Sequence, residues 1–167
     1  MKRKNLLMSL TLAGALSTLG SQAHATSWMD FDDAAVGGLG ISNDSANPTV
    51  LNQVTVVCPA TGFLVATATS TAFLRNLVGT KTTGAVVFSI TLNGTNAQNE
   101  AARTVVVQNL GPNTFANIPA SLQRVEACNS GETRTYYHTA HGSIGPGNQV
   151  ATEGRSRLVV EFFDTRI

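Results

Sequence analysis

The sequence is short of cysteine, of charge and of long apolar runs. Of its 167 residues only two are cysteine and 13% are charged, and there is no Cys-x-x-Cys motif. The absence of that motif and of a third ligand argues against a catalytic or metal-binding thiol pair. The balance of charge left after the N-terminal segment is slightly acidic, which is no electrostatic footprint for nucleic acid, so we expect no nucleic-acid binding. Past the N-terminal segment no apolar run approaches the ~20 residues of a membrane-spanning helix, so we expect no membrane insertion.

The first 25 residues have the pattern of a cleaved secretory signal peptide. Three basic residues at 2–4 precede an apolar run over 6–19, and Ala23-His24-Ala25 supplies a small–x–small cleavage site. The apolar run is too short to cross a bilayer of ~30 Å hydrocarbon. No cysteine stands at the cleavage point, which argues against a bacterial lipoprotein. We therefore expect an exported bacterial protein, periplasmic or extracellular, whose mature chain begins at Thr26.

The mature chain would have 142 residues, enough for one domain with a core of its own. It carries eight basic and ten acidic side chains, a net charge of −2. Thr, Ser, Asn, Gly and Val are abundant, as in exported proteins with β-branched strands and Gly/Asn turns. We expect an N-terminal arm and loop over residues 26–50, followed by one β-sandwich domain over 51–167.

Alternating apolar and polar residues recur in short stretches, separated by turn residues, with no sustained helical period. We expect strands over residues 50–58, 63–74, 85–92, 103–110, 121–128, 132–141 and 157–163. The alternation places one set of side chains inward: Val54, Val56, Cys58, Leu64, Ala66, Ala68, Ala72, Leu74, Phe88, Ile90, Leu92, Leu158, Val160 and Phe162. The pattern predicts an all-β protein, an antiparallel β-sandwich of jelly-roll type with about eight to ten strands.

The connections carry further expectations. Pro59–Gly62 and Asn129–Gly131 are predicted to be the turns of two hairpins, and Asn93-Gly94 is a strong hairpin signal. Residues 142–154 contain four glycines and a proline, and we expect a long loop there. We expect Phe115 and Ile118 to plug the core ahead of Pro119.

The two cysteines are predicted to form one disulfide. Cys58 and Cys128 each stand where a predicted strand meets a turn, and cysteines of exported proteins are usually bonded. The pairing places the two turns side by side at one end of the fold. It would close a segment of 69 residues.

Several stretches resemble the complement-type globular head and tumour necrosis factor-like jelly rolls. The segment Val54-Thr-Val-Val-Cys-Pro-Ala-Thr-Gly-Phe-Leu-Val-Ala-Thr-Ala68 is similar to the strand, Pro-x-x-Gly-aromatic, strand unit of that superfamily. Ser89–Gly94, Ser121–Tyr137 and Leu158–Phe163 resemble later strands, so the resemblance spans Leu51–Ile167. It implies a ten-strand jelly roll, often a homotrimer, that acts by binding rather than catalysis. The chain has no collagen-like stalk, the disulfide is no hallmark of the family, and no ligand residues carry over.

Candidate metal ligands are few. His138 and His141 would point to opposite faces of a strand and so could not hold one ion together without a bulge. One histidine with Glu126 or Glu132 remains open, but surface or edge histidines are the simpler interpretation. Asp30, Asp32 and Asp33 could form half of a calcium site, although they lack the glycine and distal glutamate of the calcium loop. We expect no metal, no cofactor and no catalytic residue.

Enzyme motifs are also absent. Gly142-Ser-Ile-Gly145 is not a nucleophile elbow, and Gly37-Gly-Leu-Gly40 lacks the βα setting of a phosphate loop. We therefore expect an exported, non-catalytic binding or structural module with a protein or carbohydrate partner. The alternative is a pilin-like fimbrial subunit, although residues 26–40 do not alternate as a donor strand should. A small secreted hydrolase is a weaker alternative.

Overall fold

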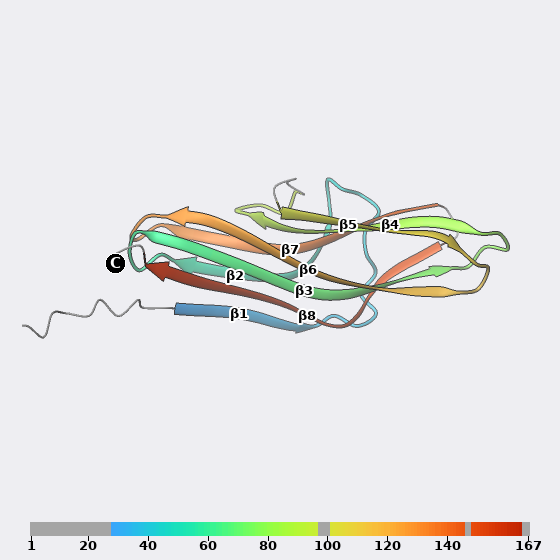
Figure 1. Ribbon diagram of the computed structural model, residues 1–167, viewed down its shortest axis with the longest axis horizontal. Coiled ribbons are helices and arrows are strands. Elements are labelled where there is room, and N and C mark those ends of the chain that lie inside the picture. Colours follow the sequence, from blue (N-terminus) through green and yellow to red (C-terminus); the bar gives the residue numbers. More distant parts are fainter. Residues whose placement is uncertain (1–27, 97–100, 146–147, 165–167) are drawn as a thin grey trace, which may run out of the picture.

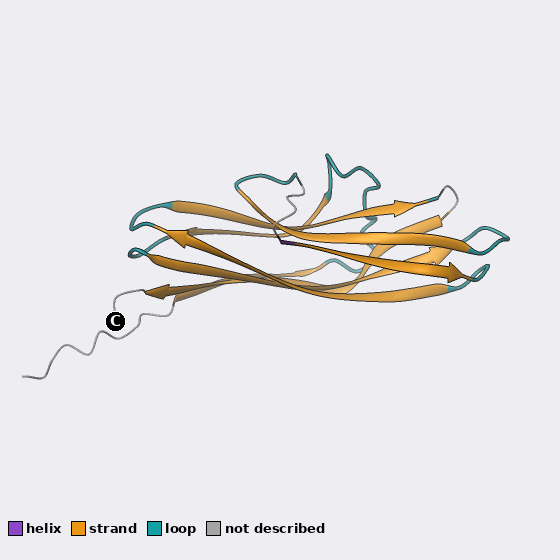
Figure 2. Cartoon of the chain, turned by 45° about the horizontal axis from the view of Figure 1, so that its top comes forward, coloured by secondary structure: helices purple, strands orange, loops and turns teal. Residues whose placement is uncertain are grey.

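The computed structural model describes residues 28–96, 101–145 and 148–164, and these form an elongated sandwich of two sheets (Figures 1 and 2). The expected signal peptide, residues 1–25, lies outside the described residues. Eight strands make up the sandwich: β1 (Trp28–Ala35), β2 (Thr49–Val57), β3 (Gly62–Asn76), β4 (Thr82–Leu92), β5 (Ala102–Leu110), β6 (Phe115–Cys128), β7 (Thr133–Ile144) and β8 (Asn148–Asp164). None of the described residues belongs to a helix that could span a membrane.

The strand order defines a jelly roll. Sheet A has the order β1-β8-β3-β6 and sheet B the order β2-β7-β4-β5, with every neighbouring pair antiparallel. The pairs β1–β8, β2–β7, β3–β6 and β4–β5 are those of one long antiparallel double strand. Rolling that double strand places successive pairs in opposite sheets, as in the eight-stranded jelly roll. The predicted fold class is confirmed, and the described residues hold eight strands rather than the ten that the resemblance implies.

The core lies between the two sheets and is built by alternation. Inward residues of β3 are small near its middle and larger near its ends, from Leu64 through Ala66, Ala68 and Ala72 to Leu74, and all are fully buried. Large side chains share the same cluster: Phe88, Ile90, Tyr136, Leu158, Val160 and Phe162. Burial of apolar area at about 25 cal/mol per Å² drives this packing. The predicted inward faces of β2, β3 and β8 are confirmed.

The N-terminal arm was expected to be irregular, but its residues 28–35 form β1. This strand pairs with β8 from Trp28↔Phe162 to Ala35↔Arg155. The strand was not predicted, because Asp30 and Asp32 stand where an apolar residue would be expected. β1 is the edge strand of sheet A, and half-buried carboxylates at an edge can still accept hydrogen bonds. Asp32 lies on the inward side, and its Oδ2 accepts a hydrogen bond from the Gln53 backbone N–H at 3.0 Å.

The expected late loop is also mostly strand. β7 continues to Ile144 and β8 begins at Asn148, so Gly142 and Gly154 lie within the sheets. Gly142 packs against the loop before β2, and a Cβ there would lie 2.7 Å from Asn43 Oδ1. β6 likewise begins at Phe115 and runs through Pro119, which an edge strand tolerates. Ile118 is buried as predicted, but Phe115 is 67% exposed and does not plug the core.

Two predicted hairpins are instead crossings between the sheets. β2 and β6 lead through their turns to β3 and β7, which lie in the opposite sheets. The expectation that these two turns lie side by side is confirmed. The backbone N–H of Cys58 donates to the Glu132 carbonyl at 2.9 Å, and that of Gly131 donates to the Cys58 carbonyl at 2.8 Å. β4 and β5 do pair with each other, and Asn93 has the positive φ of 55° typical of a turn.

The start of β3 tolerates no side chain. A Cβ at Gly62 would overlap the Phe163 carbonyl oxygen and lie 2.8 Å from the Phe162 ring, whereas one at Gly79 would meet nothing within 4 Å. We expect Gly62→Ala to lower the free energy of unfolding by about 1–3 kcal/mol through overpacking, and Gly79→Ala to leave it within ~0.5 kcal/mol. Urea denaturation of both variants measures this, and equal stabilities would contradict the close approach.

Candidate functional site

An open groove of about 530 Å³ lies on the outer face of sheet A, at the end where β3 finishes. Its floor comes from two neighbouring strands, with Phe73 and Arg75 on β3 and Phe115 and Asn117 on β6. Residues after β1, in the turn before β6 and within β8 complete the lining: Gly37, Gly38, Asn113 and Gly154.

Strand register brings the floor residues together. Phe73 lies opposite Asn117, and Arg75 lies opposite Phe115. Directly opposite residues have Cβ atoms about 4.5–5.5 Å apart, and diagonal neighbours remain within reach of aromatic side chains. The two phenyl rings therefore lie on one diagonal of this four-residue floor, and the amide and guanidinium groups lie on the other.

One side of the groove is lined by three glycines, which have no side chains to fill it. Gly38 and Gly154 have φ angles of 82° and 71°, which L side chains rarely adopt. The Val36 backbone N–H donates to the Gly154 carbonyl at 3.1 Å, which ties the segment after β1 to β8. A Cβ at Gly37 would lie 3.5 Å from the Gly154 nitrogen. Gly37 and Gly38, which lack the setting of a phosphate loop, thus line one side of this groove.

Asn76 fixes the turn that carries Asn113. It is fully buried, and its Nδ2 donates to the carbonyls of Leu110 at 2.8 Å and Gly111 at 3.0 Å. Its backbone N–H donates to the Thr114 carbonyl at 2.9 Å. One side chain therefore holds the β5–β6 turn, in which Asn113 has a positive φ of 55°. Neither this role nor the groove could be predicted from the sequence, because only the register of β3 on β6 reveals them.

The groove is suited to binding rather than to bond cleavage. Two phenyl faces, two carboxamides and one guanidinium line it, and among the described lining residues Arg75 alone is ionisable. Asparagine both donates and accepts hydrogen bonds, while arginine only donates. Apolar surface with a few convergent polar groups is the usual make-up of a small-molecule site.

His138 was expected at the surface or an edge, and this is wrong. It is fully buried between the sheets, because β7 is an inner strand of sheet B. Its Nδ1 lies 3.0 Å from Ser156 Oγ and 3.4 Å from Asn52 Oδ1, and its Nε2 lies 3.4 Å from Ser70 Oγ. Asn52 Nδ2 in turn donates to the Ser156 carbonyl at 3.1 Å. The cluster joins β2 and β7 to β3 and β8.

This cluster is a structural link between the sheets. Serine, histidine and asparagine here lie in a row, but Ser70 and His138 are both buried and no substrate could reach them. Asn52 Oδ1 can only accept, so Nδ1 of His138 carries the proton and Nε2 accepts from Ser70. Burial lowers the pKa of His138 from 6.5 to about 4, so the ring is neutral at pH 7.

His141 does not join His138 in a metal site. His141 is half-buried on the outer face of sheet B, so the two histidines do point to opposite faces as predicted. Burial lowers its pKa, and the Asp44 carboxylate partly opposes this shift.

Asp33 pairs with Arg155 at 3.2 Å, on the opposite face of β1 from Asp30 and Asp32. Within residues 28–96, 101–145 and 148–164, no group of three His, Cys, Asp or Glu could hold a metal.

The two glutamates proposed as partners of a histidine ligand are paired with arginines. Glu126 Oε1 lies 2.7 Å from Nε of Arg124, whose Nη1 donates to the Ile90 carbonyl at 3.1 Å. Glu132 Oε1 lies 2.6 Å from Nη2 of Arg134. These contacts explain why neither carboxylate is directed at His138 or His141.

Cys58 and Cys128 are buried next to each other, here as free thiols. Burial raises the pKa of Cys58 to about 12, and the hydrogen bond with the Cys128 thiol adds to the shift. Thiols with such a pKa are poor nucleophiles at neutral pH, which argues against a catalytic role. Their proximity permits the predicted disulfide, which stays a prediction.

The fold defines the protein as a jelly-roll β-sandwich, and comparisons with known proteins take the assignment no further. No family model and no curated protein matches the sequence. Among solved structures, the chain is similar to part of dimeric latent PorU from Porphyromonas gingivalis, with a TM-score of 0.41 and 18% identity. The match covers 88% of this chain but only 14% of that one.

Smaller proteins show weaker similarity. A family 35 carbohydrate-binding module from Clostridium thermocellum matches with a TM-score of 0.30 and 12% identity over 81% of this chain and 98% of that one. The Eiger tumour necrosis factor of S. frugiperda matches with a TM-score of 0.34 and 12% identity over 77% and 91%. At these scores the similarities add nothing to the observed topology.

The cysteine pair gives one prediction. We expect the exported protein, denatured without reductant, to yield no titratable thiol. A disulfide that closes a 69-residue segment stabilises by roughly 4 kcal/mol in the chain-entropy model, so reduction lowers the free energy of unfolding by about that amount. A Cys58→Ala/Cys128→Ala variant serves as the control and should not respond to reductant. Two thiols per chain in the untreated protein would contradict the pairing.

The buried histidine gives a second prediction. Its folded pKa of about 4 is below the unfolded value of 6.5, so the unfolded state binds the extra proton first. Stability is therefore complete above pH 6.5 and is lost as pH falls towards 4, by up to about 3 kcal/mol from this group. Urea denaturation across this range should show a smaller loss for His138→Gln than for the wild type or the matched His141→Gln. An unchanged pH slope in His138→Gln would contradict the assignment.

Proposed function

We propose that this protein is an exported, non-catalytic binding module whose groove on sheet A takes an oligosaccharide. The observation that carries the proposal is the floor of the groove, where Phe73 and Phe115 alternate with Asn117 and Arg75 at paired positions of β3 and β6. The described residues that line the groove include no nucleophile and no general base. The cluster in which His138 meets Ser70 and Ser156 is buried.

A sugar matches this surface better than other small ligands. Sugar rings present C–H groups on one face, which pack on aromatic rings, and hydroxyls at the edge, which both donate and accept hydrogen bonds. Phe115 offers an exposed ring, and the neighbouring carboxamides of Asn113 and Asn117 offer both kinds of partner. The groove is open along the sheet surface, so a chain of sugar units could enter without a closing movement.

The pilin-like alternative receives no support from the strand arrangement. A pilin completes its sheet with a strand donated by a neighbour. Here β8 is paired on both sides by strands of its own chain, with β1 on one side and β3 on the other. The N-terminal strand is therefore used within the molecule.

The test is calorimetric titration with a panel of soluble oligosaccharides of β- and α-linked hexoses and pentoses. We expect at least one to bind the wild type, and Phe115→Ala to weaken that binding about tenfold, which corresponds to ~1.4 kcal/mol. The matched control is Phe63→Ala, the same change at a half-exposed phenylalanine on the far end of β3. Failure of every sugar to bind at millimolar concentration, or binding that Phe115→Ala leaves unchanged, would overturn the proposal.

A further inference from the structure

Arg75 brings a positive charge to the groove, and none of the described side chains pairs with it. It is exposed near the end of β3 and has no hydrogen bond, ion pair or ring contact with the described residues. By contrast, Arg124, Arg134 and Arg155 each lie 2.6–3.2 Å from a carboxylate oxygen. The Arg75 guanidinium is therefore available to a ligand in the groove.

The acidic residues of sheet A stand away from this charge. Three of them lie opposite the first four residues of β3: Glu126, Glu161 and Asp164. The strand from Val65 to Arg75 spans roughly 33 Å, several times the Debye length of about 8 Å at physiological ionic strength. The closest acidic position in the register is Glu153, opposite Thr71 and about 13 Å along the strand from Arg75.

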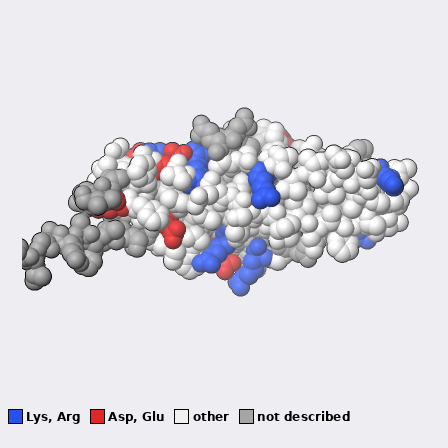
Figure 3. All heavy atoms as spheres, in the orientation of Figure 1, with Lys and Arg blue, Asp and Glu red and all other residues white. Residues whose placement is uncertain are grey.

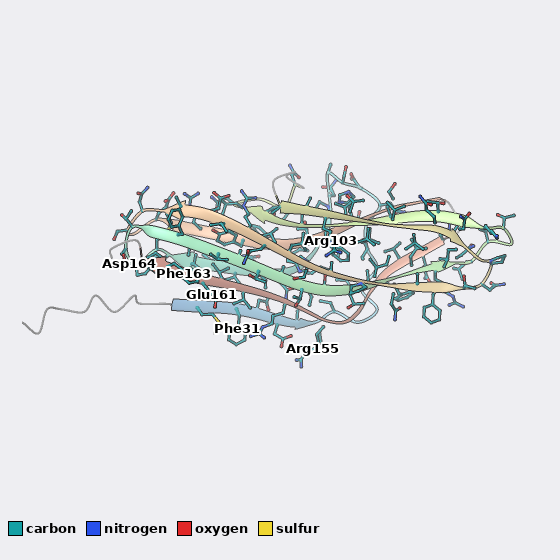
Figure 4. The ribbon with its side chains drawn as sticks, viewed as in Figure 1. Phe31, Arg103, Arg155, Glu161, Phe163 and Asp164 are labelled. Atoms are coloured by element: carbon teal, nitrogen blue, oxygen red, sulfur yellow. The ribbon has the colours of Figure 1, made fainter. Side chains whose placement is uncertain are left out.

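The same separation of charge is visible in the figures. Glu161 and Asp164 lie toward the end of the sandwich where β3 begins (Figure 4). Over the end where β3 finishes, the face drawn in Figure 3 shows basic side chains and, among the described residues, no acidic ones. Arg155 follows Gly154 of the groove, but its charge is paired with Asp33 at 3.2 Å. The groove therefore lies at the basic end of sheet A.

Arg75 stands directly beside the aromatic surface of the groove. It lies opposite Phe115 on β6 and two residues from Phe73 on the same face of β3. Opposite residues have Cβ atoms about 4.5–5.5 Å apart, and side chains two residues apart on one strand are separated by about 7 Å. A sugar ring stacked on either phenyl group would therefore have its edge within reach of the guanidinium. Carboxylate and sulfate groups of sugars project from that edge.

We propose that the groove selects oligosaccharides that carry an anionic group, a carboxylate or a sulfate ester, and that Arg75 binds this group. The inference rests on the proposed sugar binding and adds the charge of the ligand to it. The planar guanidinium presents paired N–H donors that match an oxyanion, and such charge-assisted hydrogen bonds are about twice as strong as neutral ones. A sugar with a free amino group would place a second positive charge beside Arg75, so the groove disfavours it.

The test is calorimetric titration with three forms of one oligosaccharide: a uronic-acid oligomer, the same oligomer with its carboxyl groups reduced to alcohols, and the reduced oligomer after sulfation. We expect at least one anionic form to bind the wild type roughly tenfold more tightly than the reduced form, and the comparison of the two anionic forms identifies the group. Arg75→Gln should bind all three with the wild-type affinity for the reduced form. Lys81→Gln is the matched control, because it removes an equal charge from the loop after β3, outside the groove lining.

The outcomes separate this inference from the sugar binding on which it rests. Equal affinities of the wild type for all three forms, or failure of all three while a neutral sugar binds, would overturn the anionic preference alone. So would a preference that persists in Arg75→Gln, because another group would then recognise the charge. Failure of every sugar would overturn sugar binding itself, and this inference with it. A preference that added salt weakens, and that Arg75→Gln removes without changing the affinity for the reduced form, supports the assignment.

Discussion

The fold depends on the pairing of β3 along its whole length. This 15-residue strand lies between β6 and β8, and both ladders run from Gly62 to its last residues. A strand paired on both sides has every inward and outward position decided by its register, because a slip of one residue exchanges its two faces. Its inward alanines leave room in the core for larger side chains, and its outward residues form part of the outer face of sheet A, where the groove lies.

The two sheets are joined by an apolar core that contains a polar cluster around His138. His138 and Asn52 from sheet B meet Ser70 and Ser156 from sheet A, and each donor has an acceptor. Buried polar groups destabilise unless they are satisfied, and a satisfied network favours one alignment of the sheets over others. The cluster lies next to a bulge in β8, where the step from Thr69 to Thr71 on β3 is matched by the longer step from Arg157 to Glu153 on β8. We infer that the cluster sets the alignment of the sheets at that bulge.

Much of this arrangement could be predicted from the sequence, for reasons that particular residues make clear. The alternation from Leu64 to Leu74 reports burial directly, so the inward face of β3 and the class of fold followed from it. β1 was not predicted because its inward positions include Asp30 and Asp32, which interrupt the alternation of apolar and polar residues that marks a strand. An edge strand can accommodate such carboxylates. The groove was missed because Phe73 and Phe115 are 42 residues apart, and only the pairing of β3 with β6 brings them together.

The proposed function follows from the floor of the groove, where the pairing of β3 with β6 brings two phenyl rings and two polar side chains together. The amide resonances of β3 in a two-dimensional NMR spectrum test it most directly, through titration with an oligosaccharide. The sugar should shift the resonances of residues near Phe73 and Arg75 and leave those near Phe63 and Val65 in place. Shifts confined to sheet B, or equal shifts along the whole of β3, would contradict the proposal.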